Sequence, residues 1–242
     1  MKTTDYIKFI IYKLPKGYVF TYVDFISEVN KKEAVIKSLN RLAASGKIKK
    51  LSKGRFYKPE KTPFGTLQPH QKQIVKDLLE KDRKLLGYIT GLGIYNQLGF
   101  TTQVSNTIQI GRNEVRPALK RGLYKISFVK QKNTITKENI PLLQLLDVIR
   151  FIKKIPDTTV AASCKRLKVL FADLNKESIG SLIRLSMKYP PSARALLGTL
   201  LEDMRLDDGL LVNLKQSLNP ITVYNYSLSE REFPTIKNWN IV

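Results

Sequence analysis

The sequence predicts a two-domain α+β protein: an N-terminal winged helix-turn-helix, then a larger mixed α/β domain with a helical C-terminal half. Three observations predict it. The first sixty residues show helix and strand patterns in the order of a winged helix, a proline-rich segment follows them, and helix patterns dominate from about residue 140 onward. A length of 242 residues suits one large or two modest domains. The expected boundaries are a domain over residues 1–60, a linker over 61–69 and a second domain over 70–242.

Basic residues outnumber acidic ones by 42 to 20, which gives a formal net charge of +22. Residues 1–60 carry 14 basic and 5 acidic side chains, residues 61–140 carry 14 and 5, and residues 141–242 carry 14 and 10. A field this positive favours polyanions such as nucleic acid or anionic lipid. The alternative is that a lysine-rich surface serves solubility alone.

One cysteine, Cys164, and one histidine, His70, exclude several classes of site. A single thiol forms no internal disulfide and no cysteine-based zinc site, and one imidazole argues against a histidine metal cluster. We therefore expect no metal and no cofactor, a small buried side chain at Cys164, and a capping or surface position for His70. No apolar run reaches the roughly 18 residues of a membrane span, and the first residues lack a signal-peptide core. These features predict a soluble, cytoplasmic protein.

The first sixty residues show three helix patterns. Apolar side chains at helical spacing predict the first helix: Tyr6, Ile7, Ile10, Ile11 and Leu14. After a short β-prone run at 18–20, Thr21 is expected to cap a second helix over Tyr22 to Val29. Asn30 and Glu33 have the spacing of a capping box, which predicts a third helix over Lys31 to Ser45 that ends at Gly46.

The third helix is predicted to have a buried and an exposed face. Its apolar side chains fall on one side: Val35, Leu39 and Leu42. Lys37, Asn40 and Arg41 fall on the other, and arginine and asparagine are side chains whose forks read guanine and adenine edges in a major groove. Lys31 and Lys32 at the start of the helix are assigned to phosphates.

Two β-prone runs flank the turn Ser52-Lys53-Gly54 and predict a hairpin. It carries five basic residues: Lys47, Lys49, Lys50, Lys53 and Arg55. In a winged helix-turn-helix, the recognition helix enters the major groove and the wing touches the flanking backbone. The alternative is a lysine-protected sheet edge without a ligand.

The larger domain begins with a predicted helix over Gln71 to Leu86 and a glycine-rich stretch from Gly87 to Gly93. No Lys-Ser or Lys-Thr follows as a phosphate-binding loop requires, and Asn96 stands where a dinucleotide fingerprint needs its third glycine. Strands are expected over 107–110 and 124–129. Helices are expected over 141–154, 160–170, 176–189 and 192–204, and Trp239 is expected to dock the C-terminal tail.

The span from Tyr88-Ile89-Thr90-Gly91 through Gly99-Phe100-Thr101-Thr102-Gln103-Val104 resembles the central segment of AbiEi-type antitoxins of type IV toxin–antitoxin systems. The first domain, with its Arg55-Phe56-Tyr57-Lys58-Pro59 run, is similar as well. So is the closing stretch, which contains Leu218-Asn219-Pro220, Tyr224 and Pro234 to Ile241. The resemblance covers nearly the whole chain and rests on structural motifs.

The resemblance implies a transcriptional regulator that represses its own operon and counteracts a nucleotidyltransferase-like toxin, with or without touching it. The expected partner is double-stranded operator DNA, often an inverted repeat, and no membrane and no enzymatic activity are expected. Six lysines would capture phosphates: Lys31, Lys32, Lys47, Lys49, Lys50 and Lys53. Lys37, Asn40 and Arg41 would then read bases.

Two rival functions stay open on the sequence. One is a nucleotidyltransferase-like enzyme, for which Asp203, Asp207 and Asp208 are the available metal ligands, although the strand over 107–110 lacks the carboxylates such an enzyme needs. The other is a protein-interaction module that binds a toxin directly. A second basic cluster could extend the DNA contact or bind a phosphorylated or nucleotide ligand: Lys120, Arg121, Lys125, Lys130 and Lys132.

Overall fold

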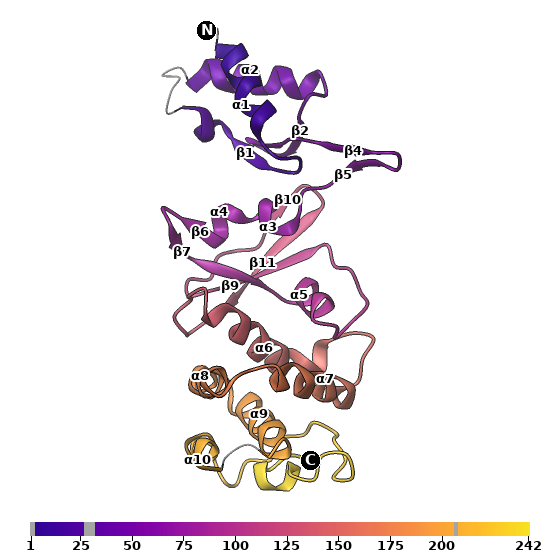
Figure 1. Ribbon diagram of the computed structural model, residues 1–242, viewed down its shortest axis with the longest axis vertical. Helices are drawn as coiled ribbons and strands as arrows, with labels where there is room; N and C mark the ends of the chain where they lie inside the picture. Colours follow the sequence, from indigo (N-terminus) through magenta and orange to yellow (C-terminus); the bar gives the residue numbers. More distant parts are fainter. Residues whose placement is uncertain (1–2, 27–31, 206–207) are drawn as a thin grey trace. The chain divides into compact units, whose positions relative to one another are not determined.

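The computed structural model describes residues 3–26, 32–205 and 208–242, which form a mixed α/β protein with several small sheets (Figure 1). This agrees with the predicted α+β class. The chain divides into two compact units, the first made of residues 1–78 and 119–125 and the second of residues 79–118 and 126–242. The first unit thus extends beyond the expected boundary near residue 60 and includes a short segment from much later in the chain.

The first unit begins with α1 (Thr3–Lys13), β1 (Val19–Thr21) and a short 3-10 helix (Tyr22–Phe25), followed by α2 (Lys32–Ala44). Thr21 caps as expected: its hydroxyl accepts from the Val23 amide, and its own amide donates to Asp24 at 2.7 Å. The predicted second helix is confirmed only as the 3-10 turn, because residues 27–31, including the proposed cap Asn30, lie outside the described part.

A three-stranded antiparallel sheet completes the core of this unit. β2 (Lys49–Ser52) and β3 (Arg55–Tyr57) form the predicted hairpin, and β1 pairs with the other side of β3. Phe20 lies opposite Phe56 and meets Phe25 edge-on, with ring centroids 5.6 Å apart. These rings pack with buried aliphatic side chains of both helices: Ile7, Val35 and Leu39.

The expected linker at 61–69 is wrong, because this segment forms a hairpin of β4 (Glu60–Thr62) and β5 (Gly65–Leu67). Gly65 has a φ of +119°, and the Thr62 hydroxyl donates to its carbonyl at 3.0 Å, which closes the turn. The three prolines of the segment, Pro59, Pro63 and Pro69, all lie outside the two strands, where they cost no ladder hydrogen bond.

The single helix predicted over Gln71 to Leu86 is also wrong. The structure has two one-turn helices, α3 (Gln71–Ile74) and α4 (Lys76–Leu79), and then a tight hairpin of β6 (Glu80–Lys81) and β7 (Lys84–Leu85). Asp82 and Arg83 take φ values of 50° and 63°. Two consecutive left-handed residues make the turn whose twist matches a hairpin, and they cannot continue a right-handed helix.

The second unit contains a sheet in which β8 (Gly87–Thr90), β9 (Thr107–Arg112) and β11 (Tyr124–Lys130) lie side by side in the order β11-β9-β8. The first two residues of β11 and all of β10 (Leu119–Arg121) count with the first unit. A short helix, α5 (Leu92–Gln97), follows β8. At Gly91 between them, φ is +79°, and an added Cβ would lie 2.0 Å from Gln109 Oε1, so this glycine serves a tight strand-to-helix turn.

The helical half agrees with the sequence expectation to within three residues at most ends. It contains α6 (Asn139–Phe151) continued by a 3-10 turn (Ile152–Lys154), α7 (Val160–Ala172), α8 (Lys176–Ser186), α9 (Pro191–Asp203), α10 (Asp208–Gln216) and a final 3-10 turn (Ile236–Trp239). α6 packs against α8 and α9 (Figure 1). Among the described residues, no helix has the length and apolar character needed to cross a membrane.

Trp239 docks the C-terminal tail, as predicted. Its ring is 1% exposed and lies against Gly198 of α9, where a Cβ would come within 2.2 Å of it. Its indole N–H donates to Glu202 of the same helix. Between residues 221 and 226 the structure has one parallel bridge, from Tyr224 to Ile241.

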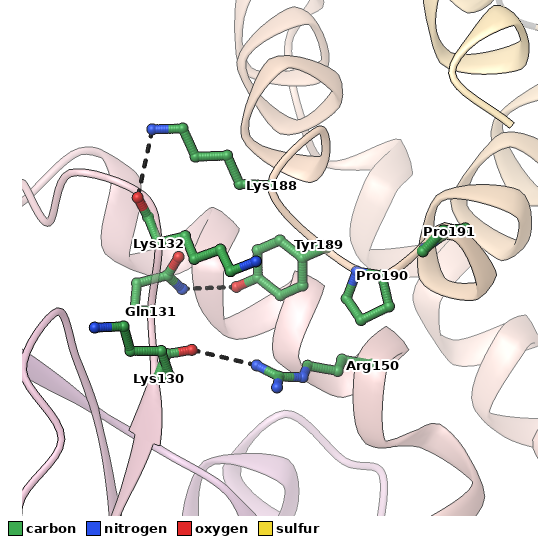
Figure 2. A pocket seen from close by; sticks show the side chains of 8 residues that line it. All are labelled: Lys130, Gln131, Lys132, Arg150, Lys188, Tyr189, Pro190 and Pro191. Atoms are coloured by element: carbon green, nitrogen blue, oxygen red, sulfur yellow. Dashed lines mark hydrogen bonds between the residues drawn. The ribbon is translucent and has the colours of Figure 1, made fainter.

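A buried carboxylate lies at the centre of the second unit. Asp147 of α6 has no exposed surface and accepts hydrogen bonds from Tyr88 (2.7 Å), Thr90 (2.8 Å) and Tyr189 (2.9 Å). Gln131 donates to both tyrosine hydroxyls, and Figure 2 shows its contact with Tyr189. Burial raises the pKa of Asp147 and the three hydrogen bonds oppose that rise. One buried polar network thus connects the sheet with α6 and the end of α8.

Asp147→Ala is expected to destabilise the second unit by about 3 kcal/mol, because three buried hydroxyls lose their acceptor. The fluorescence of Trp239, the single tryptophan, reports unfolding of this unit in urea. Asp173→Ala, which removes an exposed carboxylate of the same unit, is the control and should change stability little. Equal effects of the two substitutions would contradict the structural role of Asp147.

The raised pKa of Asp147 predicts a direction with pH. The folded protein binds a proton at this carboxyl more tightly than the unfolded chain, whose aspartates titrate at about 3.9, so the stabilisation that Asp147 provides falls as pH rises above about 4. Asp147→Asn carries no such proton. The stability advantage of the wild type over this variant should therefore shrink between about pH 4 and pH 7. A constant difference in unfolding free energy across that range would refute the shift.

Candidate nucleic-acid interface

The exposed face of α2 carries the side chains predicted to read bases. Lys37, Asn40 and Arg41 are all exposed, whereas Val35, Leu39 and Leu42 on the opposite face are buried. Positions 37, 40 and 41 are three and four residues apart and therefore neighbours on one side of the helix. The predicted division of this helix into two faces is confirmed.

Lys32 stands at the first turn of α2. It is exposed, and its Nζ lies 5.2 Å from the centroid of the Tyr22 ring. Lys31, the other lysine assigned to this end of the helix, lies outside the described residues. Of the two lysines predicted to contact phosphates at the start of α2, the structure therefore describes only Lys32.

The β2–β3 hairpin begins directly at the end of α2. Gly46, with a φ of +71°, ends the helix, and the amides of Lys47 and Ile48 both donate to the carbonyl of Leu42. Lys47, Lys49, Lys50 and Lys53 are all exposed. The first unit therefore presents four exposed lysines in this segment: Lys47 before β2, Lys49 and Lys50 on β2, and Lys53 in the hairpin turn.

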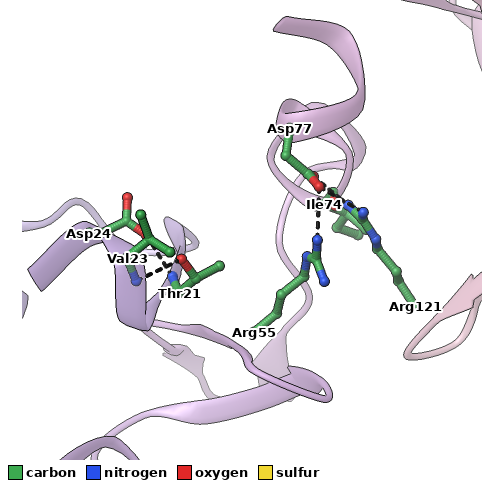
Figure 3. Close-up of polar contacts among 7 residues, drawn as sticks. All are labelled: Thr21, Val23, Asp24, Arg55, Ile74, Asp77 and Arg121. Carbon is green, nitrogen blue, oxygen red and sulfur yellow. Dashed lines mark hydrogen bonds and ion pairs between the residues drawn. The ribbon is translucent and has the colours of Figure 1, made fainter. Parts of the chain in front are cut away.

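Arg55, the fifth hairpin cation, differs from the four hairpin lysines because it has an ion-pair partner. Its guanidinium forms an ion pair with Asp77 at 2.8 Å and its side chain is 29% exposed (Figure 3). Arg121, assigned from the sequence to the second basic cluster, is 4% exposed and binds the same carboxylate at 2.5 Å and 2.8 Å and the Ile74 carbonyl at 2.7 Å. Both arginines are committed to holding the first unit together.

Asp77, which the sequence did not single out, is the carboxylate that holds both arginines. Burial acts to raise the pKa of its carboxyl, but the hydrogen bonds and charges of Arg121 and then Arg55 outweigh burial and hold the pKa below its ordinary value. It therefore stays ionised and forms ion pairs with two of the cations that the sequence offers for binding. The signal available in the sequence was weak: one acid between Lys76 and two leucines.

The remaining members of the second basic cluster fall in different units. Lys120 and Lys125 are exposed and belong to the first unit, whereas Lys130 and Lys132 are exposed and belong to the second. The four lysines therefore do not form one cluster within either unit.

The residues considered for catalysis have structural roles where they are described. Asp203 is ion-paired with Lys168, and Asp207 and the side chain of Asp208 are outside the described set. In the part of the chain that the structure describes, no three His, Cys, Asp or Glu residues are close enough to hold a metal ion. His70 caps α3 by accepting from the Lys72 amide, and burial raises the pKa of Cys164 to about 12.

Comparisons with known proteins give a fold and a family. The crystal structure of RV2827C protein from Mycobacterium tuberculosis resembles this chain with a TM-score of 0.62 at 14% sequence identity, over 98% of this chain and 89% of that one. At this identity the likeness concerns the fold alone. No curated protein matches the sequence. A family model, described as a family of unknown function, matches residues 6–200, and the chain therefore belongs to that family, DUF6088.

Proposed function

We propose that the protein is a DNA-binding transcriptional regulator whose first unit is a winged helix-turn-helix. In this proposal α2 is the recognition helix and the β2–β3 hairpin is the wing. One observation carries it: an exposed helix face with Lys37, Asn40 and Arg41 continues directly into a hairpin with four exposed lysines. Among the described ion pairs, none involves these seven residues.

The chemistry of this surface suits double-stranded DNA. Lysines are point charges that contact phosphates at many angles and fix a protein on the duplex, which suits the hairpin and Lys32. Arg41 and Asn40 are fork-shaped donors that can bind two atoms of a base edge. An operator with inverted half-sites fits this mode if two chains bind it.

The antitoxin role is part of the same proposal and rests on the resemblance to AbiEi-type antitoxins. The protein would work in the cytoplasm, repress its own operon and counteract a nucleotidyltransferase-like toxin, without enzymatic activity of its own. Growth rescue on co-expression with a toxin of that class tests this part. Rescue by a variant that no longer binds DNA would assign toxin control to the second unit.

Asn40→Ala and Arg41→Ala should each weaken binding to the DNA upstream of the gene by about tenfold to a hundredfold, since a good base contact discriminates by about 1–3 kcal/mol. Binding to a scrambled duplex should change far less. The control is Lys61→Ala, an exposed cation on β4 of the same unit. If the wild type does not distinguish the two duplexes at physiological salt, sequence-specific recognition is refuted.

Salt dependence tests the phosphate contacts separately. If each of the six lysines neutralises one phosphate and each contact contributes roughly 0.9, the slope of log K against log salt is about −5. Replacing Lys49 and Lys50 by glutamine should flatten the slope by about two units. Arg55→Gln should leave it unchanged, because that guanidinium is held by Asp77. A flat slope for the wild type would remove the basis for electrostatic capture.

A further inference from the structure

Two pockets in the second unit share one arginine, Arg150 at the end of α6. The first has a volume of about 220 Å³ (Figure 2) and is lined by Lys130, Gln131, Lys132, Arg150, Lys188, Tyr189, Pro190 and Pro191. The second has a volume of about 320 Å³, and its lining includes Arg150, Phe151, Lys153, Lys154, Ser192, Asn225 and two tyrosines, Tyr224 and Tyr226. All of these residues belong to the second unit.

All the charged side chains that line the two pockets are positive. Six cations line the two pockets together: Lys130, Lys132, Arg150, Lys153, Lys154 and Lys188. No carboxylate is among the lining residues, and the described ion pairs include none of these cations. Six like charges repel one another, so an arrangement of this kind is stabilised by a bound anion.

Arg150 is held in place without losing its capacity to bind. One guanidinium nitrogen donates to the Lys130 carbonyl at 3.3 Å, as Figure 2 shows, and the guanidinium lies 4.9 Å from the Phe151 ring centroid. A guanidinium has five N–H donors, and its fork matches the oxygens of a phosphate. Most of its donors therefore stay available to a ligand between the two pockets.

The second pocket also holds a buried polar group without a partner. Tyr224 is 9% exposed, and its buried hydroxyl has no hydrogen-bond partner in the structure. An unsatisfied buried hydroxyl costs free energy, and because Tyr224 lines the second pocket, a ligand that reaches this hydroxyl would supply the missing partner. This observation is independent of the charge.

The positive end of a long helix lies at the same place. α9, of 13 residues, begins with Pro190 as its cap and Pro191 as its first residue, and its start has no side-chain cap. Pro190 and Pro191 line the first pocket and Ser192 lines the second. The partial positive charge of a helix N-terminus favours an anion there, and it adds to the six side-chain charges.

We propose that these two pockets form one binding site for the phosphate groups of a nucleotide ligand, with Arg150 between them. The lysines and the start of α9 take the phosphates. The second pocket is also lined by the partly buried Phe151, by the buried Tyr224 and Tyr226, and by the polar Ser192 and Asn225, a mixed lining of the kind that suits a nucleoside. The nucleotide is either free or part of a single-stranded nucleic acid. The site is independent of the proposed DNA-binding function of the first unit.

Isothermal titration calorimetry of the full chain with ATP, with pyrophosphate and with a single-stranded oligoribonucleotide tests the proposal. Saturable binding is expected, and Arg150→Gln should weaken it at least about tenfold, because a charge-assisted fork contact is lost. Arg231→Gln removes the same charge from an exposed position of the same unit and should leave binding unchanged. Binding of ATP and pyrophosphate identifies a free nucleotide, and binding of the oligoribonucleotide alone identifies a nucleic-acid strand.

Tyr224→Phe provides a second, milder variant. It removes only the unpartnered hydroxyl, so folding should be retained, while binding should weaken by about fivefold to tenfold. Lys49→Gln with Lys50→Gln, placed in the first unit, should not alter ATP binding, which separates this site from the DNA surface. The proposal is overturned if none of the three probes binds saturably, if Arg150→Gln and Arg231→Gln behave alike, or if a polyglutamate peptide competes as well as ATP does.

Discussion

The buried carboxylate of Asp147 is the constraint on which the second unit depends. A charged or polar group with no access to water has to be hydrogen-bonded, and its three donors come from two places in the chain: Tyr88 and Thr90 on β8, and Tyr189 after α8. Their convergence fixes α6 against the sheet and fixes where the chain leaves α8. Arg150 follows Asp147 by three residues on α6, and Pro190 follows Tyr189 directly. The same network therefore places the arginine and the helix start that line the pockets.

Asp77 plays a similar part in the first unit, with an opposite effect on charge. Its carboxylate pairs with Arg55 and Arg121, which come from segments 66 residues apart by number, 121 minus 55. An arginine that is 4% exposed has to keep a partner, since an unpaired buried charge is costly. Arg55 and Arg121, which the sequence offers for ligand binding, are thus held in ion pairs with Asp77. The lysines of α2 and the hairpin carry no such partner among the described ion pairs, and they define the surface that stays available.

Sequence patterns predicted the long elements with periodic apolar spacing. They failed where the backbone angles of a few residues determine whether the chain forms a helix or a turn. The helices of the C-terminal half and the two faces of α2 follow from apolar spacing alone. The helix predicted over Gln71 to Leu86 failed because Asp82 and Arg83 adopt left-handed angles, which an apolar pattern does not encode. The apolar pattern over 141–154 predicts the helix that carries Asp147, but the role of this carboxyl depends on hydroxyls 57 to 59 residues before it and 42 after it.

The two units differ in where their cations lie, more than in how many cations they carry. On the first unit the unpaired lysines stand on an exposed helix face and an exposed hairpin, where water screens each of them, so useful affinity requires many simultaneous contacts with an extended polyanion. On the second unit six exposed cations line two pockets beside a helix start, so a compact anion bound there would meet several of them at once. A net charge of +22 is common to both settings. The positions of those charges, on a helix face and a hairpin in one unit and around two pockets in the other, are the basis of the two different ligands that we propose.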